Sequence, residues 1–290
     1  MTAVPKEGLQ RLSPKDFPSL LREISDPPKQ LWLRGELPST DKKWLAVVGA
    51  RACTPYGRQT VDYLIKGLAG YPIVVVSGLA YGIDAEAHKA ALKYGLQTVA
   101  VPGSGLNWDV IYPKAHGALA REIIAAGGAH LSEEEPETKT MDYMFPKRNR
   151  IMVGLCHATL VVEAKEKSGS LITAKLAVEY NRDLLVVPGS IFSDSSRGTH
   201  QFLRLGAQAA TSAADILQTL GLTENKSAAL ELRTDLSENE IRVLNIIASP
   251  LSRDELIRAL ELPITEANVL LSAMEIKGLI VESLGVVRDA

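Results

Sequence analysis

The hexamer Phe145-Pro-Lys147-Arg148-Asn149-Arg150 is the most basic in the sequence, and it adds an amide and an aromatic ring to three cations. Lysine and arginine pair with phosphates, and an aromatic ring can stack on a nucleobase. The apolar stretch that follows predicts a helix over 147–156, and cations at a helix N-terminus oppose the helix dipole. That small cost favours a bound anion here, although composition alone fits a solvated helix start equally well.

Small-residue loops form the second candidate site, because nearly every predicted strand ends in such a loop, which leads to the N-terminus of a helix. Helix N-termini attract anions, and glycine lets the backbone approach a phosphate closely. Any one loop is more simply a tight turn, whereas several at one sheet edge indicate a ligand that carries phosphate. The loops cover residues 49–57, 77–84, 102–107, 165–170, 189–190 and 197–199.

Common nucleotide and metal motifs do not occur in the sequence. There is no G-x-x-x-x-G-K-[ST] motif, and the loop after the first strand of the predicted sheet is not G-x-G-x-x-G. Ser77-Gly78 ends the next strand, where a ribose-binding protein carries an acidic residue. Cys53 and Cys156 form neither a disulfide framework nor a zinc-binding pattern. We therefore expect no cofactor, no metal and, without a visible nucleophile–base pair, no catalytic residue.

These loops require a parallel sheet to bring them to one edge. Short Val-rich segments, apolar on both faces, alternate with amphipathic segments, as in a parallel sheet covered by helices. This alternation predicts a doubly wound, Rossmann-like α/β fold. The predicted strands of the sheet are 45–49, 73–77, 97–101, 129–132, 158–164 and 184–188, and the predicted helices are 57–69, 84–94, 115–126, 147–156 and 170–181. A further short strand, 31–35, is predicted ahead of this sheet.

The predicted domains follow from changes in this pattern. Residues 1–40 read as an N-terminal extension with a short helix within 15–28, residues 41–220 as the Rossmann-like domain, and residues 221–236 as a polar linker. Residues 237–290 read as three helices and a β-hairpin, which is typical of a small winged-helix domain. Ser237 with Glu240, and Ser252 with Glu255, are capping-box pairs for the first two of these helices.

Charge restricts the partners of each region. The chain has a net charge of −2, so a nucleic-acid contact must be a local patch. Residues 221–290 hold seven Lys and Arg against twelve Asp and Glu, so we expect this winged helix to contact protein, or to do little on DNA alone. The N-terminus lacks a signal-peptide pattern, and the apolar run 151–162 is too short to span a bilayer. We expect a cytoplasmic protein without a membrane partner.

The motifs VVGAR-x5-G, VSGLAYGIDAEAH, FPKRNRI, LVVEAKEKSGSLITA and RGTHQFLRLGA occur in this order within residues 15–220. The chain thereby resembles the DNA-processing protein A family, also called DprA or Smf. The resemblance implies a cytoplasmic, homodimeric protein that binds single-stranded DNA. It also implies a non-enzymatic recombination mediator, which protects incoming DNA and loads the RecA recombinase during natural transformation.

The resemblance also implies which residues bind the strand. It places the following along one pocket: Arg51, Ser77, Gly78, Gly82, Lys147, Arg148, Asn149, Arg150, Gly169, Ser170 and Lys175. Gly49 of the first loop and Phe145 of the basic hexamer complete the predicted site. An alternative class is a nucleotide-processing phosphoribohydrolase on a related Rossmann-like sheet. Those enzymes carry a PGGxGTxxE motif, and the comparable loops here lack its glutamate. A structural module without a ligand is a third possibility.

Overall fold

The structure, a computed structural model, describes residues 8–166, 168–223, 236–247, 251–283 and 285–289. The chain divides into two compact units, residues 1–224 and residues 225–290. Each unit has an apolar core of its own, so each is described by itself. Among the helices of the described residues, none is both long and apolar enough to cross a membrane.

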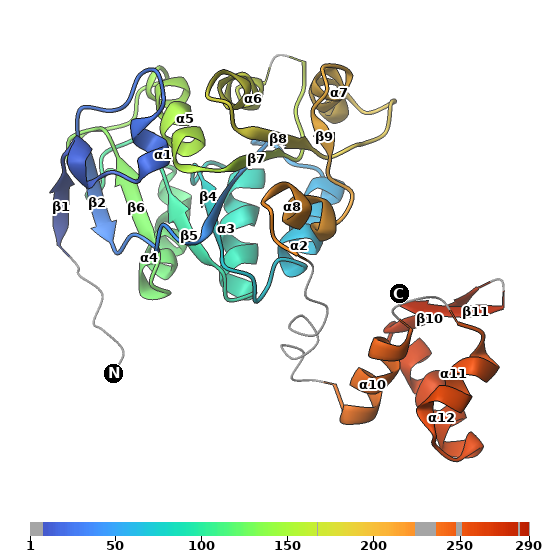
Figure 1. Ribbon diagram of the computed structural model, residues 1–290. Coiled ribbons are helices and arrows are strands. Elements are labelled where there is room, and N and C mark those ends of the chain that lie inside the picture. Colours follow the sequence, from blue (N-terminus) through green and yellow to red (C-terminus); the bar gives the residue numbers. More distant parts are fainter. Residues whose placement is uncertain (1–7, 167, 224–235, 248–250, 284, 290) are drawn as a thin grey trace. The chain divides into compact units, whose positions relative to one another are not determined.

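A nine-stranded sheet is the centre of the first unit, in the order β1-β2-β6-β5-β4-β3-β7-β8-β9 (Figure 1). The run from β6 to β9 is parallel, whereas β1 and β2 extend it as antiparallel strands. The strands are β1 (Leu9–Leu12), β2 (Leu31–Gly35), β3 (Lys43–Val48), β4 (Ile73–Ser77), β5 (Gln97–Ala100), β6 (Ala129–Ser132), β7 (Ala158–Val161), β8 (Asp183–Val186) and β9 (Gln208–Ala209).

Helices cover both faces of this sheet. One apolar cluster joins Trp44, Ala46 and Val48 to α1, α5, α6 and α7, and a second joins Leu45 and Val47 to α2, α3 and α8. Alternate residues of β3 therefore point to opposite helix layers, as a strand buried on both sides requires. The helices are α1 (Ser19–Arg22), α2 (Pro55–Lys66), α3 (Ile83–Lys93), α4 (Gly117–Ala125), α5 (Met144–Leu155), α6 (Ser170–Glu179), α7 (Arg197–Arg204) and α8 (Ala213–Thr219).

The order of strands reverses at β3. From β3 the chain proceeds to β4, β5 and β6 on one side, and then returns to β7, β8 and β9 on the other. The loops that follow the carboxyl ends of β3 and β7 therefore lead to helices on opposite faces of the sheet. The crevice between these two loops is where an open α/β sheet binds its ligand.

The predicted Rossmann-like fold is confirmed, with some corrections to its elements. Residues 8–40 are not a separate extension, because they contribute β1 and β2 to the main sheet. The helix expected within 15–28 is only the four-residue α1, preceded by a 3-10 turn at Pro14–Asp16. The structure also contains four elements that were not predicted from the sequence, β1, α7, β9 and α8.

The second unit is a three-helix bundle with a hairpin. It consists of α10 (Glu238–Ile246), α11 (Arg253–Leu260), α12 (Ile264–Ile276), β10 (Ile280–Ser283) and β11 (Val286–Asp289). Both predicted capping boxes are present, since Ser237 and Ser252 accept from the backbone N–H groups of Glu240 and Glu255. This arrangement confirms the winged helix, whereas most of the expected linker lies outside the described residues.

Candidate nucleic-acid interface

A cleft of about 650 Å³ opens where β3 and β7 diverge. Its walls come from the loop after β3, the N-terminal part of α5 and the loop that leads into α6. Seven of the thirteen residues expected at the site line this cleft: Gly49, Arg51, Phe145, Arg148, Asn149, Gly169 and Ser170. The topological switch point of the sheet thus brings together three segments that lie far apart in the sequence.

An exposed cation and an aromatic ring stack at the mouth of the cleft. The guanidinium carbon of Arg51 lies 4.4 Å from the centre of the Phe145 ring. The ring of Tyr112 lies on Phe145 as well, with 5.8 Å between ring centres. Arg51 is exposed and Phe145 is half-buried. This arrangement offers a phosphate partner next to a surface on which a base can stack.

Arg148 supplies a second positive charge, which is buried in the wall of the cleft. Its guanidinium donates to the carbonyl of Val101, and only 7% of the residue is exposed. A Cβ on Gly78 would lie 1.7 Å from Nη1 of Arg148, so the guanidinium occupies space that only glycine leaves. Burial lowers the pKa of Arg148 to about 10, against the opposing effect of Asp84. The side chain is therefore still cationic at neutral pH.

Asp84 is the anionic neighbour of this arginine. Its Oδ2 accepts from the backbone N–H of Gly78 at 3.1 Å. Burial raises the pKa of the Asp84 carboxyl, while the charge of Arg148 and the backbone N–H groups of Ala80 and Gly78 act in the other direction. The carboxylate holds the loop after β4 and partly balances the buried cation.

The N-terminus of α6 forms the opposite wall. Ser170, the first helical residue, is 8% exposed, and its Oγ lies 2.7 Å from Oγ of Ser168. Gly169, the N-cap residue, has no side chain to cap the helix, and the space around it is open. The first N–H groups of the helix are already engaged, because Ser170 donates to Oγ of Ser168 and Leu171 donates to the carbonyl of Ser168. What this end offers an anion is the positive end of the helix dipole.

Lys147 and Arg150 do not line the cleft, contrary to expectation. Lys147 forms ion pairs with Glu133 and Glu134 at 3.2 and 3.0 Å, and Arg150 pairs with Glu133 at 2.6 Å and with Asp26 at 3.5 Å. The two cations are three residues apart on α5 and so share a side of the helix, whereas Arg148 points elsewhere. The acidic side chains, rather than a phosphate, balance these cations.

Three other expected residues do not line the cleft. Ser77 and Gly82 fix the conformation of the loops around it, and Lys175 lies in a neighbouring groove. Ser77 is fully buried and its hydroxyl donates to the carbonyl of Val47 at 2.6 Å. Gly82 has a φ of +75°, and a Cβ there would lie 2.5 Å from the carbonyl oxygen of Arg51. Only glycine lets α3 begin so close to the first loop. Lys175 lies on α6 and lines the groove between α6 and α7.

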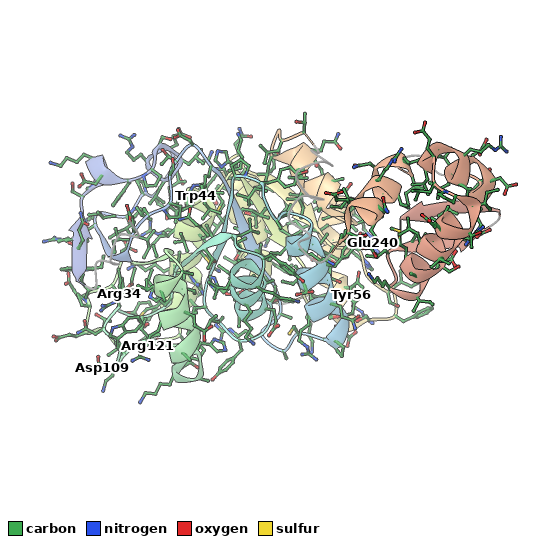
Figure 2. The ribbon with its side chains drawn as sticks, turned by 90° about the horizontal axis from the view of Figure 1, so that it is seen from below. Arg34, Trp44, Tyr56, Asp109, Arg121 and Glu240 are labelled. Carbon is green, nitrogen blue, oxygen red and sulfur yellow. The ribbon has the colours of Figure 1, made fainter. Side chains whose placement is uncertain are left out.

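A buried carboxylate that was not among the predicted site residues joins three of the loops. Glu163 is 1% exposed and accepts from the N–H of Thr54 at 2.9 Å, from the Thr54 hydroxyl at 2.6 Å and from Ser195 at 3.1 Å. Nearby, the hydroxyl of Tyr56 (labelled in Figure 2) donates to the carbonyl of Pro188 at 2.7 Å. The sequence offered one signal for this carboxylate, which is that Glu163 is a charged residue near the end of an apolar predicted strand.

Comparison with known proteins agrees with the fold of both units. Residues 9–221 match the family described as DNA recombination-mediator protein A, and residues 227–285 match the DprA winged helix domain. These two matches, together with the observed fold, define a DNA-processing protein of the recombination-mediator class. The chain belongs to the DprA/Smf family.

Relatives and solved structures support the same assignment. DNA processing protein DprA of Streptococcus pneumoniae is 45% identical over 201 residues, which cover 69% of this chain and 70% of that protein. The Bacillus subtilis protein is 40% identical over 223 residues, covering 76% and 74%. The solved S. pneumoniae structure has a TM-score of 0.66 at 41% identity and covers 72% of this chain and 74% of that one.

A second solved structure is DNA processing protein A of Helicobacter pylori. It has a TM-score of 0.64 at 31% identity and covers 74% of this chain and 96% of that one. That structure is described as giving insight into a unique single-stranded DNA binding mode.

Proposed function

We propose that this protein binds single-stranded DNA in the cleft at the switch point. The observation that carries the proposal is the stack of Arg51 on Phe145 beside the buried charge of Arg148 and the N-terminal end of the α6 dipole. A phosphate can lie between the cations and the helix end while the neighbouring base stacks on the ring. The single-strand binding described for the H. pylori relative supports the same ligand.

The stacking surface favours single strands over duplex. In a duplex the faces of the bases are covered by their neighbours, so Phe145 could not stack without opening the helix. The cleft residues are also drawn from loops and helix ends, and a major-groove reader presents an exposed helix or ribbon instead. Phosphate contacts release counterions, so affinity should fall as salt rises.

We infer further that the protein acts as a homodimeric mediator in the cytoplasm. In this role it protects incoming DNA and loads RecA on it during natural transformation. The family description as a recombination mediator supports the role. For the homodimer, support comes from the groove between α6 and α7, where Val178 and Leu205 are 65% and 80% exposed.

A titration of oligo-dT and of a blunt duplex of equal length, followed by fluorescence anisotropy, tests the binding proposal. We expect tighter binding of the single strand, with an affinity that decreases with salt. Equal or tighter binding of the duplex would contradict the proposal.

The proposal treats the protein as a binder rather than an enzyme. Asp84, a carboxyl with a raised pKa that lines the cleft, is the group a hydrolase could use as an acid. Its Oδ2 is already engaged by the N–H of Gly78, which supports a structural role. Release of free base or phosphoribose from nucleoside monophosphates by the pure protein, lost in Asp84→Asn, would establish the phosphoribohydrolase alternative.

A further inference from the structure

The exposed cation of the cleft, Arg51, lies in a short stretch of loop that is fixed at both ends. At one end the carbonyl of Ala50 accepts from the backbone N–H of Ile83 at 3.2 Å. At the other end Thr54 caps α2, because its hydroxyl accepts from the N–H of Gly57 at 3.2 Å. Three residues lie between Ala50 and Thr54, so the backbone of Arg51 is restricted from both sides.

Glu163 holds the second of these fixed points. Its Oε2 accepts from the N–H of Thr54 at 2.9 Å, and its Oε1 accepts from the Thr54 hydroxyl at 2.6 Å. A Cβ on Gly57 would lie 2.4 Å from Oε2, so the carboxylate lies directly against the first turn of α2. The dipole of α2 favours a carboxylate at this end of the helix. The acceptor for Thr54 therefore comes from the loop after β7 and not from the loop that carries Arg51.

The Glu163 side chain is itself held in one position. It is 1% exposed, and the hydroxyl of Ser195 donates to its Oε1 at 3.1 Å. The backbone of the next residue, Ala164, donates to the carbonyl of Ser195 and accepts from the N–H of Gly198, both at 2.8 Å. Glu163 is therefore a fixed acceptor, whose position is set by the loops after β7 and β8.

We propose that Glu163 is a positioning residue for DNA binding, which holds the loop of Arg51 in the conformation that meets the strand. This role rests on the proposed function, in which Arg51 and Phe145 contact DNA. Glu163 is buried and does not line the cleft, so it acts through the loop rather than on DNA. A loop that is ordered before binding loses less freedom on binding, and affinity is higher for that reason.

A double-mutant cycle in the full-length chain tests this role. Glu163→Gln keeps the shape of the side chain but replaces one acceptor oxygen with an NH2 group, so a hydrogen bond to Thr54 is lost. We expect about a fivefold loss of oligo-dT affinity by fluorescence anisotropy, which corresponds to the cost of ordering a small part of a loop. In an Arg51→Ala background the same change should have little further effect, because no guanidinium remains to be positioned.

The cycle distinguishes positioning from general support of the fold. A loss of equal size in both backgrounds would overturn the proposal, and so would unchanged affinity in Glu163→Gln alone. If the unmodified chain does not prefer oligo-dT over duplex, the proposed function fails, and the positioning role fails with it.

Thr54 provides a second test that leaves the buried carboxylate in place. Thr54→Ala loses the hydroxyl that bonds to Glu163 and should weaken oligo-dT binding, whereas Thr54→Ser keeps the hydroxyl and should bind normally. Ser212→Ala is the matched control, because it removes the N-cap of α8 without touching the loop of Arg51. A loss of affinity in Ser212→Ala as large as that in Thr54→Ala would assign the effect to stability and overturn the proposal.

Exchange of backbone amide hydrogens, measured by NMR without DNA, reports on the loop directly. The N–H of Thr54 donates to a buried acceptor, so it should exchange slowly in the unmodified chain and faster in Glu163→Gln. The N–H of Asp215, which donates to the cap of α8, should exchange at the same rate in both. Unchanged exchange at Thr54 in Glu163→Gln would show that the carboxylate does not hold the loop.

Discussion

Arg51 is the cleft residue whose charge can be reversed with least effect on the core. Its guanidinium is exposed and stacks on Phe145. We expect Arg51→Glu to weaken oligo-dT binding at least about tenfold, or ~1.4 kcal/mol, through lost contact and repulsion of phosphate. The melting temperature should change little, because exposed charges contribute little to stability. Anisotropy and thermal melting on the same sample provide both values.

Lys66→Glu is the matched control for this charge change. Lys66 is exposed at the last residue of α2, whereas the cleft lies near the first turn of that helix. Lys66→Glu gives the protein the same net charge as Arg51→Glu. Comparable losses of oligo-dT affinity in the two variants would therefore indicate a general charge effect. Normal affinity in Arg51→Glu would remove Arg51 from the binding site.

Arg148 calls for a different test, because it is buried beside Asp84. Reversing its charge would bury two carboxyls together and would disrupt the fold as well as binding. Gly78→Ala is milder, since the added Cβ must displace the guanidinium from which it would lie 1.7 Å. We expect a loss of about 1–3 kcal/mol in the free energy of unfolding, measured by urea denaturation, together with weaker DNA binding.

Gly169→Ala provides the comparison for stability. Its φ is −59° and a Cβ there meets nothing within 4 Å, so unfolding should be nearly unchanged. If both glycine variants unfold at the same urea concentration, the guanidinium of Arg148 is not held against Gly78.

At the scale of elements, Val-rich strands and capping residues were enough to predict the sheet and most helices. Short or polar elements were not predictable, since α7 contains few apolar residues and β9 has only two residues, both exposed. The cleft was partly predictable because parallel strands align their carboxyl ends. The pairing of Arg150 with Glu133 and Asp26 was not predictable, because those carboxylates come from segments distant in the sequence.

Helices α10 and α12 are joined by an ion pair that predicts a pH dependence. The hydrogen bond from Lys277, followed by that from the Ser237 backbone, lowers the pKa of Glu240 from 4.5 to about 2. A carboxyl whose pKa is lower in the folded state adds stability above its unfolded pKa and loses it on protonation. We expect the winged-helix unit to lose stability as the pH falls from 4.5 toward 2.

NMR resonances of residues 236–289 are the suitable measurement, because Trp32, Trp44 and Trp108 all lie in the other unit. Glu240→Gln should flatten the acid transition of these resonances. Glu238→Gln, at an exposed position of the same helix, should leave it as it is. An unchanged transition in Glu240→Gln would show that the pair with Lys277 does not couple the helices.

At the scale of the whole molecule, the acidic winged-helix unit should be dispensable for binding oligo-dT. A chain that ends at Thr223 keeps the cleft and also keeps Leu220, which is 3% exposed in the core, with Leu222 packed beside it. We expect this truncated chain to retain single-strand affinity within about tenfold. A folded truncated chain that fails to bind would show that the cleft is not sufficient.

The two edges of the sheet limit how copies of this protein can adhere to one another. One edge is β9, which is two residues long, and the other is β1, which turns Gln10 and Arg11 toward solvent. Long, flat, apolar edges recruit further strands and cause aggregation, whereas short or charged edges resist it. These two edges therefore offer little backbone for pairing with a strand of another copy. Many copies bound close together on one DNA strand are thus not expected to join their sheets into fibrils.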